Sequence, residues 1–200
     1  MPSHLRQAPR QARGARRVAA LLRAADAVLA EAGYEAATMC DIAARAGAAI
    51  GSLYQFFPGK DALVEALRDR YNLEFARVWR ALRRDAAGLG PAAFAGRLIA
   101  LVVEFARDHP AFLRLMDAPC GGGARLRRAS TQARIAQVLR ARDRRAPLAA
   151  VRRRAAVMQQ VVRGMLTLYA RASAREQQAL TTEYRALLSR YLGGAESRHE

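Results

Sequence analysis

Residues 47–60 (GAAIGSLYQFFPGK) gather several side chains that can hydrogen-bond to another molecule. Ser52 and Tyr54 carry hydroxyl groups, Gln55 carries an amide, and Lys60 is the only lysine in the 200-residue sequence. Hydroxyl and ammonium groups suit phosphate oxygens, whereas an amide can pair with the edge of a base. These residue types therefore support recognition of nucleic acid, provided that the fold turns them toward solvent.

Local signals predict two short helices that position this run. Thr38 and Asp41 have the spacing of a capping box, which starts a helix over about residues 38–46. Gly47 then ends that helix in a tight turn, and a second helix follows over about residues 49–56. Two short helices joined by a glycine turn form a helix-turn-helix, whose second helix lies in the DNA major groove.

Leu53 and Phe57 lie four residues apart and should anchor the second helix to the core. Ser52, Tyr54 and Gln55 are then turned outward, where they can reach DNA. A second interpretation is about as good on spacing alone: the tyrosine extends the core, and the lysine that follows is a solvated charge.

Composition favours polyanionic partners. The net charge of +17 comes from 34 basic and 17 acidic residues, and every basic residue except one is arginine. Residues 1–60 hold eight basic and four acidic side chains, a net +4, so bulk charge does not locate the DNA contact. The sequence shows neither a membrane-spanning run nor a secretory signal, and we expect a cytoplasmic protein with no membrane partner.

Cysteine and histidine are too few for a disulfide framework or a metal site. Cys40 and Cys120 stand far apart, and the three histidines are scattered, so we expect no metal and no cofactor. An enzyme built on Cys120 and His109 would need a base within hydrogen-bond reach and a group to orient it, and neither is indicated.

Apolar residues at helical spacing run through the chain, which predicts an all-α protein. Further helices are expected over about residues 60–87, 91–108, 111–117, 124–142, 148–173 and 174–192. The predicted organisation has four parts: a disordered arginine-rich arm (1–15), a helix-turn-helix DNA-binding domain (16–60), a helical effector-binding and dimerisation domain (61–192) and a disordered tail (193–200).

Residues 16–63, and above all TMCDIAARAGAAIGSLYQFFPGKDAL (residues 38–63), closely resemble the DNA-binding head of the TetR (tetracycline-repressor) family. The shared pattern is Thr at the helix start, then Asp-Ile-Ala, Ala-Gly, Gly-Ser-Leu-Tyr, Phe-Pro and Lys, preceded by a Gly-Tyr pair. The resemblance implies a homodimeric, ligand-responsive transcriptional regulator, usually a repressor, that binds a roughly palindromic operator. Because no catalytic arrangement is indicated, we expect that the protein is not an enzyme.

The resemblance also assigns roles to single residues. In the family, residues matching Thr38, Ser52, Tyr54 and Lys60 contact phosphates, and those matching Ile50 and Gln55 lie at the base-reading surface. The expected DNA-binding set is Thr38, Ala49, Ile50, Gly51, Ser52, Tyr54, Gln55 and Lys60.

Two members of this set depart from the family. Ala49 stands where a polar N-cap is usual, and Ile50 stands where a polar residue is frequent. We expect DNA binding to be retained with an altered operator preference, and weaker binding is the alternative. Five arginines of the arm could also reach a neighbouring minor groove or flanking phosphates: Arg6, Arg10, Arg13, Arg16 and Arg17.

Apolar stripes on the last two helices predict a four-helix dimer interface. Its expected residues are Val151, Met158, Met165, Tyr169, Leu180, Tyr184, Leu187, Leu188 and Tyr191. The alternative is that these stripes cover the core of their own protomer.

The resemblance places an apolar effector pocket between the helices of the body. Its expected residues are Phe75, Trp79, Leu82, Leu98, Leu101, Phe105, Phe112, Met116, Met158 and Val162, most of which must also serve as ordinary core. A small hydrophobic or amphipathic effector is expected. The eleven arginines and one acid of residues 118–154 usually indicate solvated surface, but they could attract an anionic effector.

Two other functions remain open from the sequence. An arginine-rich protein of this kind could bind nucleic acid without sequence preference. Cys40 and Cys120 could instead make a thiol-based redox-sensing regulator, although buried or idle cysteines are the commoner case.

Overall fold

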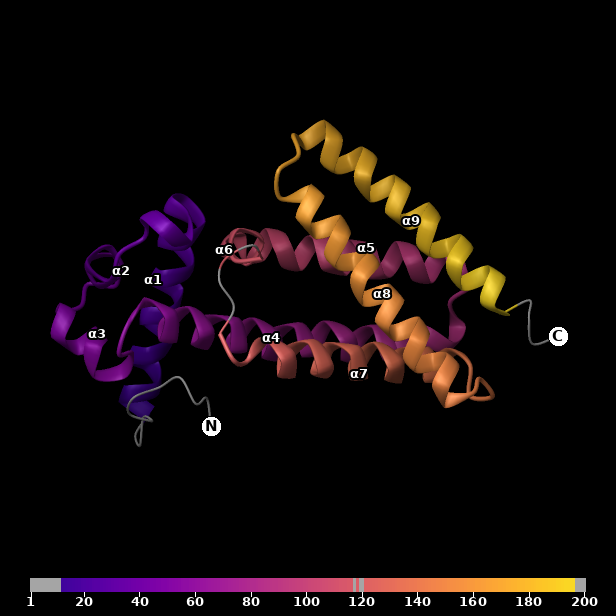
Figure 1. Cartoon of the computed structure of the whole chain (residues 1–200), viewed down its shortest axis with the longest axis horizontal. Helices are drawn as coiled ribbons and strands as arrows, with labels where there is room; N and C mark the ends of the chain where they lie inside the picture. Colours follow the sequence, from indigo (N-terminus) through magenta and orange to yellow (C-terminus); the bar gives the residue numbers. More distant parts are fainter. Residues whose placement is uncertain (1–11, 117, 119–120, 197–200) are drawn as a thin grey trace. The chain divides into compact units, whose positions relative to one another are not determined.

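The structure is a computed structural model that describes residues 12–116, 118 and 121–196, and these residues form helices and no strand (Figure 1). The all-α class is thereby confirmed. The elements are α1 (Ala12–Ala36), α2 (Met39–Arg45), α3 (Ile50–Phe56), α4 (Lys60–Asp85), a 3₁₀ turn (Ala86–Gly88), α5 (Pro91–Asp108), α6 (Pro110–Arg114), α7 (Ala124–Arg142), α8 (Leu148–Tyr169) and α9 (Ala174–Glu196). None of these helices is both long and apolar enough to cross a membrane.

Several helix boundaries differ by a few residues from those expected. Helix α1 begins at Ala12, within the stretch predicted to be disordered, and α9 continues to Glu196 beyond the predicted end. Helix α8 ends at Tyr169 because Ser173 caps the next helix, its hydroxyl and amide both lying 2.8 Å from Glu176 Oε2. The remainder of the predicted arm (1–11) and tail (197–200) lies outside the described residues.

The chain divides into two compact units. The first contains α1, α2, α3, the start of α4 as far as Leu73, and the segment Asp108–Arg125 with α6. The second contains the rest of α4 together with α5, α7, α8 and α9. The first unit therefore also contains residues 61–73 and 108–125.

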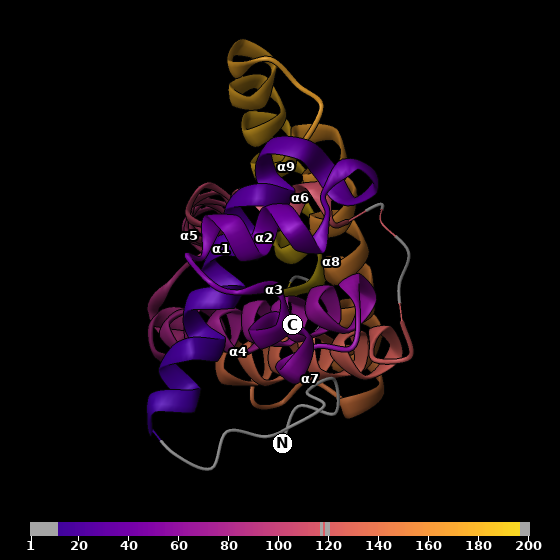
Figure 2. The ribbon, with the colours of Figure 1, turned by 90° about the vertical axis from the view of Figure 1, so that its left-hand side faces the viewer.

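In the first unit α6 and α2 pack against α1, α3 packs against α2, and the start of α4 is hydrogen-bonded to α1. Leu21 and Leu29 of α1, Ile42 of α2, Leu53 of α3 and Leu67 of α4 are all fully buried. Complete burial of a leucine or isoleucine side chain contributes about 1.5–3 kcal/mol, so these contacts fix the two short helices, which would not be stable alone. Figure 2 shows α1, α2 and α3 of this unit facing the viewer.

The second unit has its own core, to which each long helix contributes. Phe94 and Leu98 of α5, Ile135 of α7 and Met165 of α8 are buried. Helices α8 and α9 pack against each other as antiparallel neighbours (Figure 1).

Candidate nucleic-acid interface

The capping box predicted at the start of α2 is present. Thr38 Oγ1 accepts a hydrogen bond from the Asp41 amide at 3.1 Å, and Asp41 Oδ2 accepts from the Thr38 amide at 3.2 Å and its hydroxyl at 2.6 Å. Both donors of Thr38 are therefore used within the box. At a phosphate, this hydroxyl could donate a hydrogen bond only after releasing the aspartate.

The turn between α2 and α3 depends on Gly47. Its φ of 58° is in the left-handed region that glycine enters at little cost. The Gly47 amide donates to the carbonyl of Ala44 at 3.0 Å, and the Ala48 amide donates to that of Ala43 at 2.9 Å. These bonds satisfy the end of α2 and set the direction in which α3 leaves.

Helix α3 has one buried face and one exposed face. Leu53 and the following Phe57 are fully buried, as their spacing predicted. On the opposite face Ile50 is 39% exposed and Tyr54 is 43% exposed, and Gln55 is exposed beside them. Gly51 is also exposed and Ser52 is half-buried. The structure thus brings the predicted contact residues of α3 together on an accessible surface.

The residue that precedes α3 provides no side-chain cap. Ala49 has the extended backbone of an N-cap, with φ −61° and ψ 138°, but no side chain accepts a hydrogen bond there. An uncapped start is destabilising, because the first amides of a helix have no partner within it. The departure from the family pattern therefore has a local structural consequence.

Lys60 is bound to the end of α1. Its Nζ atom donates to the carbonyls of Tyr34 at 2.7 Å, Ala37 at 3.1 Å and Glu35 at 3.2 Å. The same atom lies 4.6 Å from the centre of the Tyr34 ring. An ammonium group has three N–H donors, and here all three meet carbonyls. To contact a phosphate as predicted, Lys60 would have to give up one of these three hydrogen bonds.

Two further side-chain links fix the first unit around α1. The Tyr34 hydroxyl donates to Asp61 Oδ1, and this hydrogen bond, with partial burial, raises the pKa of Tyr34 to about 12. Arg45 of α2 donates through both Nη atoms to the two Glu31 carboxylate oxygens, at 2.9 and 2.5 Å. That hydrogen-bonded ion pair lowers the pKa of Glu31. Helices α2 and α4 are thus both tied to α1 beside the candidate DNA surface.

A buried polar cluster in the first unit was missed from the sequence. Asp26 Oδ1 accepts from the Tyr71 hydroxyl at 2.6 Å and from the Ala111 amide at 3.3 Å, while His109 Nδ1 lies 3.9 Å from Asp26 Oδ2. One signal could have revealed it: the aspartate occupies the apolar face of α1, four residues after the buried Leu22. Asp26 thereby joins α1 to α4 and α6.

Most of the residues expected around an effector are buried. In the second unit Trp79, Leu82, Leu98, Phe105, Met158 and Val162 are buried, and Phe75 and Leu101 are half-buried. Phe112 and Met116 belong instead to the first unit, where Phe112 packs edge-on against Tyr71 at 5.8 Å. The structure therefore divides the predicted set between two cores.

Three aromatic rings in the second unit lie close together. The Phe75 ring centre is 4.6 Å from that of Phe105 and 5.6 Å from that of Trp79. The Trp79 side chain is only 2% exposed, and its indole N–H meets no acceptor among the described residues. An unsatisfied buried donor is uncommon and costs about 1–3 kcal/mol.

The predicted dimer stripe proves to be partly internal. Val151, Met158, Met165 and Leu188 are buried inside the protomer, because they face the core of the second unit. Leu187 is exposed as an interface residue should be, and the other predicted positions, Tyr169, Leu180, Tyr184 and Tyr191, are half-buried. Two exposed residues of α8, Val157 and Leu168, were not predicted.

The cysteines and possible metal ligands carry no further site that the structure describes. Cys40 is a free, exposed thiol on α2, whereas Cys120 lies outside the described residues. Within residues 12–116, 118 and 121–196, no group of His, Cys, Asp and Glu side chains could hold a metal ion.

Comparison with known proteins shows two family matches that together extend over most of the chain. Residues 21–67 match the model for bacterial regulatory proteins of the tetR family, and residues 90–192 match the tetracyclin repressor-like C-terminal domain. The chain is 32% identical over 110 residues to the nucleoid occlusion factor SlmA of Pasteurella multocida (strain Pm70). That match covers 54% of this chain and 51% of that protein, so the chain spans about half the length of this curated relative.

Solved structures show the same fold. A TetR-family transcriptional regulator from Streptomyces coelicolor is 27% identical with a TM-score of 0.65, and the match covers 88% of this chain and 98% of that one. Another from Pectobacterium atrosepticum is 20% identical with a TM-score of 0.72, over 93% and 97% of the two chains.

Proposed function

The chain belongs to the TetR family of DNA-binding transcriptional regulators, and from that premise we propose that it acts as a homodimeric repressor. In this proposal it binds a palindromic operator in the cytoplasm and is released by a small-molecule effector. The observation that carries the proposal is the exposed face of α3, where Ile50, Tyr54 and Gln55 project opposite the buried Leu53 and Phe57.

Each residue type on this face has a definite use against DNA. The Tyr54 hydroxyl and the half-buried Ser52 suit phosphate oxygens, and the Gln55 amide suits an adenine edge. Ile50 can contact a thymine methyl group, which replaces polar readout at that position by apolar contact. We infer an operator preference that includes A·T pairs facing α3.

Dimerisation is supported by apolar side chains left exposed on the last two helices. Val157 and Leu168 of α8 and Leu187 of α9 are exposed, although α8 and α9 already pack against each other. A second copy that pairs the same two helices would bury them in a four-helix interface. Two-fold symmetry of the protein then requires a two-fold arrangement of half-sites in the operator.

Effector binding is supported by the aromatic cluster of the second unit. The buried indole N–H of Trp79 lacks an acceptor in the described part of the chain, and Phe75 beside it is only half-buried. A ligand with an acceptor oxygen next to an apolar group would satisfy the indole and pack on the rings. We therefore propose that a small effector of that kind binds at this cluster.

Selection of bound sequences from random duplex DNA, at about 150 mM salt, tests the proposal. The wild type should enrich one palindromic motif, and Tyr54→Ala and Gln55→Ala should weaken or relax it. Leu126→Ala, which truncates an exposed leucine of α7 away from the proposed dimer interface, is the control and should leave the motif unchanged. Binding without any enriched motif would identify a nonspecific arginine-rich binder and overturn the repressor proposal.

A further inference from the structure

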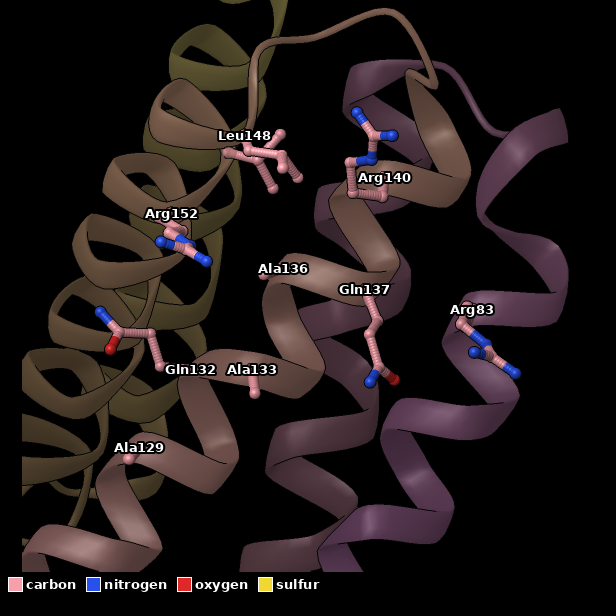
Figure 3. A pocket seen from close by; sticks show the side chains of 10 residues that line it. Arg83, Ala129, Gln132, Ala133, Ala136, Gln137, Arg140, Leu148 and Arg152 are labelled. Atoms are coloured by element: carbon pink, nitrogen blue, oxygen red, sulfur yellow. The ribbon is translucent and has the colours of Figure 1, made fainter.

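An open groove lies over the outer surface of α7 in the second unit, bordered by α4 and α8 (Figure 3). Its volume is about 610 Å³, which is within the range of roughly 300–1,000 Å³ typical of small-molecule sites. None of its lining residues belongs to the aromatic cluster around Trp79. The groove is therefore separate from the effector pocket proposed above.

The floor of the groove is apolar. Ala129, Ala133 and Ala136 follow one another along the outer surface of α7, and Leu148 at the start of α8 is 60% exposed beside them. Three small side chains leave room above the helix, and the exposed leucine provides an apolar wall. This part of the groove suits an alkyl or aryl group.

Both rims of the groove are polar and positively charged. Arg83 of α4 stands on one side with Gln137, and Arg152 of α8 stands on the other with Gln132 (Figure 3). Arg83 and Arg152 are exposed, and neither makes a hydrogen bond or ion pair with any described residue. A third lining residue, Arg140, uses one nitrogen to donate to the Ala146 carbonyl at 2.8 Å.

Two of the three helices around the groove, α7 and α8, provide no acidic side chain to balance these arginines, whereas α4 carries Asp85, which does not line the groove. Helix α7 contains six arginines and α8 contains four, and neither helix contains an acidic residue. Burial and then repulsion from Arg80 of α4 lower the pKa of Arg134, which lies on α7.

We infer that this groove binds a small amphiphilic anion, in which a carboxylate or phosphate head is joined to an apolar tail. The head pairs with the guanidinium of Arg152 or Arg83 and with the neighbouring glutamine amide, because guanidinium groups match these anions in geometry and charge. The tail covers the alanine floor and meets Leu148. The dimensions of the groove fit a small molecule better than a protein partner, whose interface would extend well beyond it.

Calorimetric titration of the whole protein with octyl phosphate tests this inference. Inorganic phosphate, which lacks the alkyl tail, and octanol, which lacks the anionic head, are the two control ligands. Each should bind at least about tenfold more weakly than octyl phosphate. If inorganic phosphate bound with the same affinity as octyl phosphate, positive charge alone would explain the binding and the inference would be overturned.

Variants locate the binding. The double variant Arg152→Gln/Arg83→Gln should lower the affinity for octyl phosphate by about tenfold or more, because a charge-assisted hydrogen bond contributes about 1.5–3 kcal/mol. Ala133→Phe should fill the exposed floor and have a similar effect. Arg153→Gln and Arg84→Gln are matched controls, since they remove adjacent exposed arginines that do not line the groove. Equal losses in the controls and the rim variants would contradict the assignment.

Fluorescence distinguishes this groove from the interior pocket. Trp79 is the only tryptophan and does not line the groove, so octyl phosphate bound there should leave its emission unchanged. A change in emission that persists in the rim variants would place the ligand in the interior pocket and overturn the inference. These measurements use protein without DNA, so their outcome is independent of whether an operator is found.

Discussion

The Nζ atom of Lys60 lies 2.7 Å from the main-chain oxygen of Tyr34, although the two residues are 26 positions apart in sequence. The same nitrogen also bonds the carbonyls of Glu35 and Ala37. The backbone of α1 departs from helical geometry at Gly33, with φ 76° and ψ 177°, and carbonyls at such a helix end have no partner within the helix. Lys60 therefore holds the end of α1 against the start of α4.

Replacing Lys60 by Met should loosen this junction. The change keeps much of the aliphatic side chain but leaves three carbonyls without their donor, which should cost about 1–3 kcal/mol of stability. Hydrogen exchange of the α1 amides should detect the loss as faster exchange. Arg23→Met, which removes an exposed charge from the same helix, should have little effect. Unchanged exchange in Lys60→Met would contradict a structural role.

The same variant distinguishes a structural role from a phosphate contact. If Lys60 also neutralises a phosphate, the slope of log affinity against log salt should fall by about one in Lys60→Met. An unchanged slope, with weaker binding overall, would assign the lysine to the junction alone.

Replacing Ala49 by Ser should stabilise α3. The backbone already has the extended conformation of an N-cap, so a hydroxyl there can accept from the uncapped amides and add about 0.5–2 kcal/mol. The reverse change at the other helix, Thr38→Ala, should remove a similar amount by breaking the capping box. Chemical denaturation measures the change in unfolding free energy for each variant. An unchanged value for Ala49→Ser would show that another group already accepts hydrogen bonds from the first amides of α3.

Stability should fall at alkaline pH through Tyr34. The raised pKa means that the folded state favours the neutral phenol, whose hydroxyl donates to Asp61. This contribution is fully present below the ordinary tyrosine value of 10.0 and is lost as pH rises through about 12. The difference in unfolding free energy between wild type and Tyr34→Phe should shrink across that range. Tyr54→Phe, which removes an exposed hydroxyl without a partner among the described residues, should show no such trend.

A charge at the exposed apolar face of α8 and α9 should weaken the dimer. Leu187→Glu would bury an unpaired carboxylate in the proposed interface, and the dissociation constant measured by sedimentation should rise at least about tenfold. Leu126→Glu is the matched control, because Leu126 is an exposed leucine of α7, away from the proposed interface. A wild-type monomer at all concentrations would contradict the interface itself.

The helix-turn-helix could be predicted because its signals are local. The Thr38–Asp41 box and Gly47 act over a few residues, and the i, i+4 spacing of Leu53 and Phe57 determines which side of α3 is buried. The structure confirms both features, and the family comparison confirms the class of regulator.

Features that depend on distant partners could not be predicted in the same way. An apolar stripe shows that a helix face is covered, but not by what, so Met158 was assigned to an interface while it packs inside the protomer. Nor does spacing show that the carbonyls of α1 lie within reach of Lys60. The groove over α7 is lined by residues of α4, α7 and α8, which are distant from one another in the sequence.

Because Lys60 is the only lysine, the opening of its junction with α1 can be followed by chemical labelling. Since the other 33 cationic side chains are arginine, an amine-directed acylating reagent has a single side-chain target in this sequence. That target can react only when its bonds to the end of α1 are broken. The rate of labelling therefore reports how often this junction opens. Slower labelling in the presence of operator DNA would show that DNA binding reduces this opening.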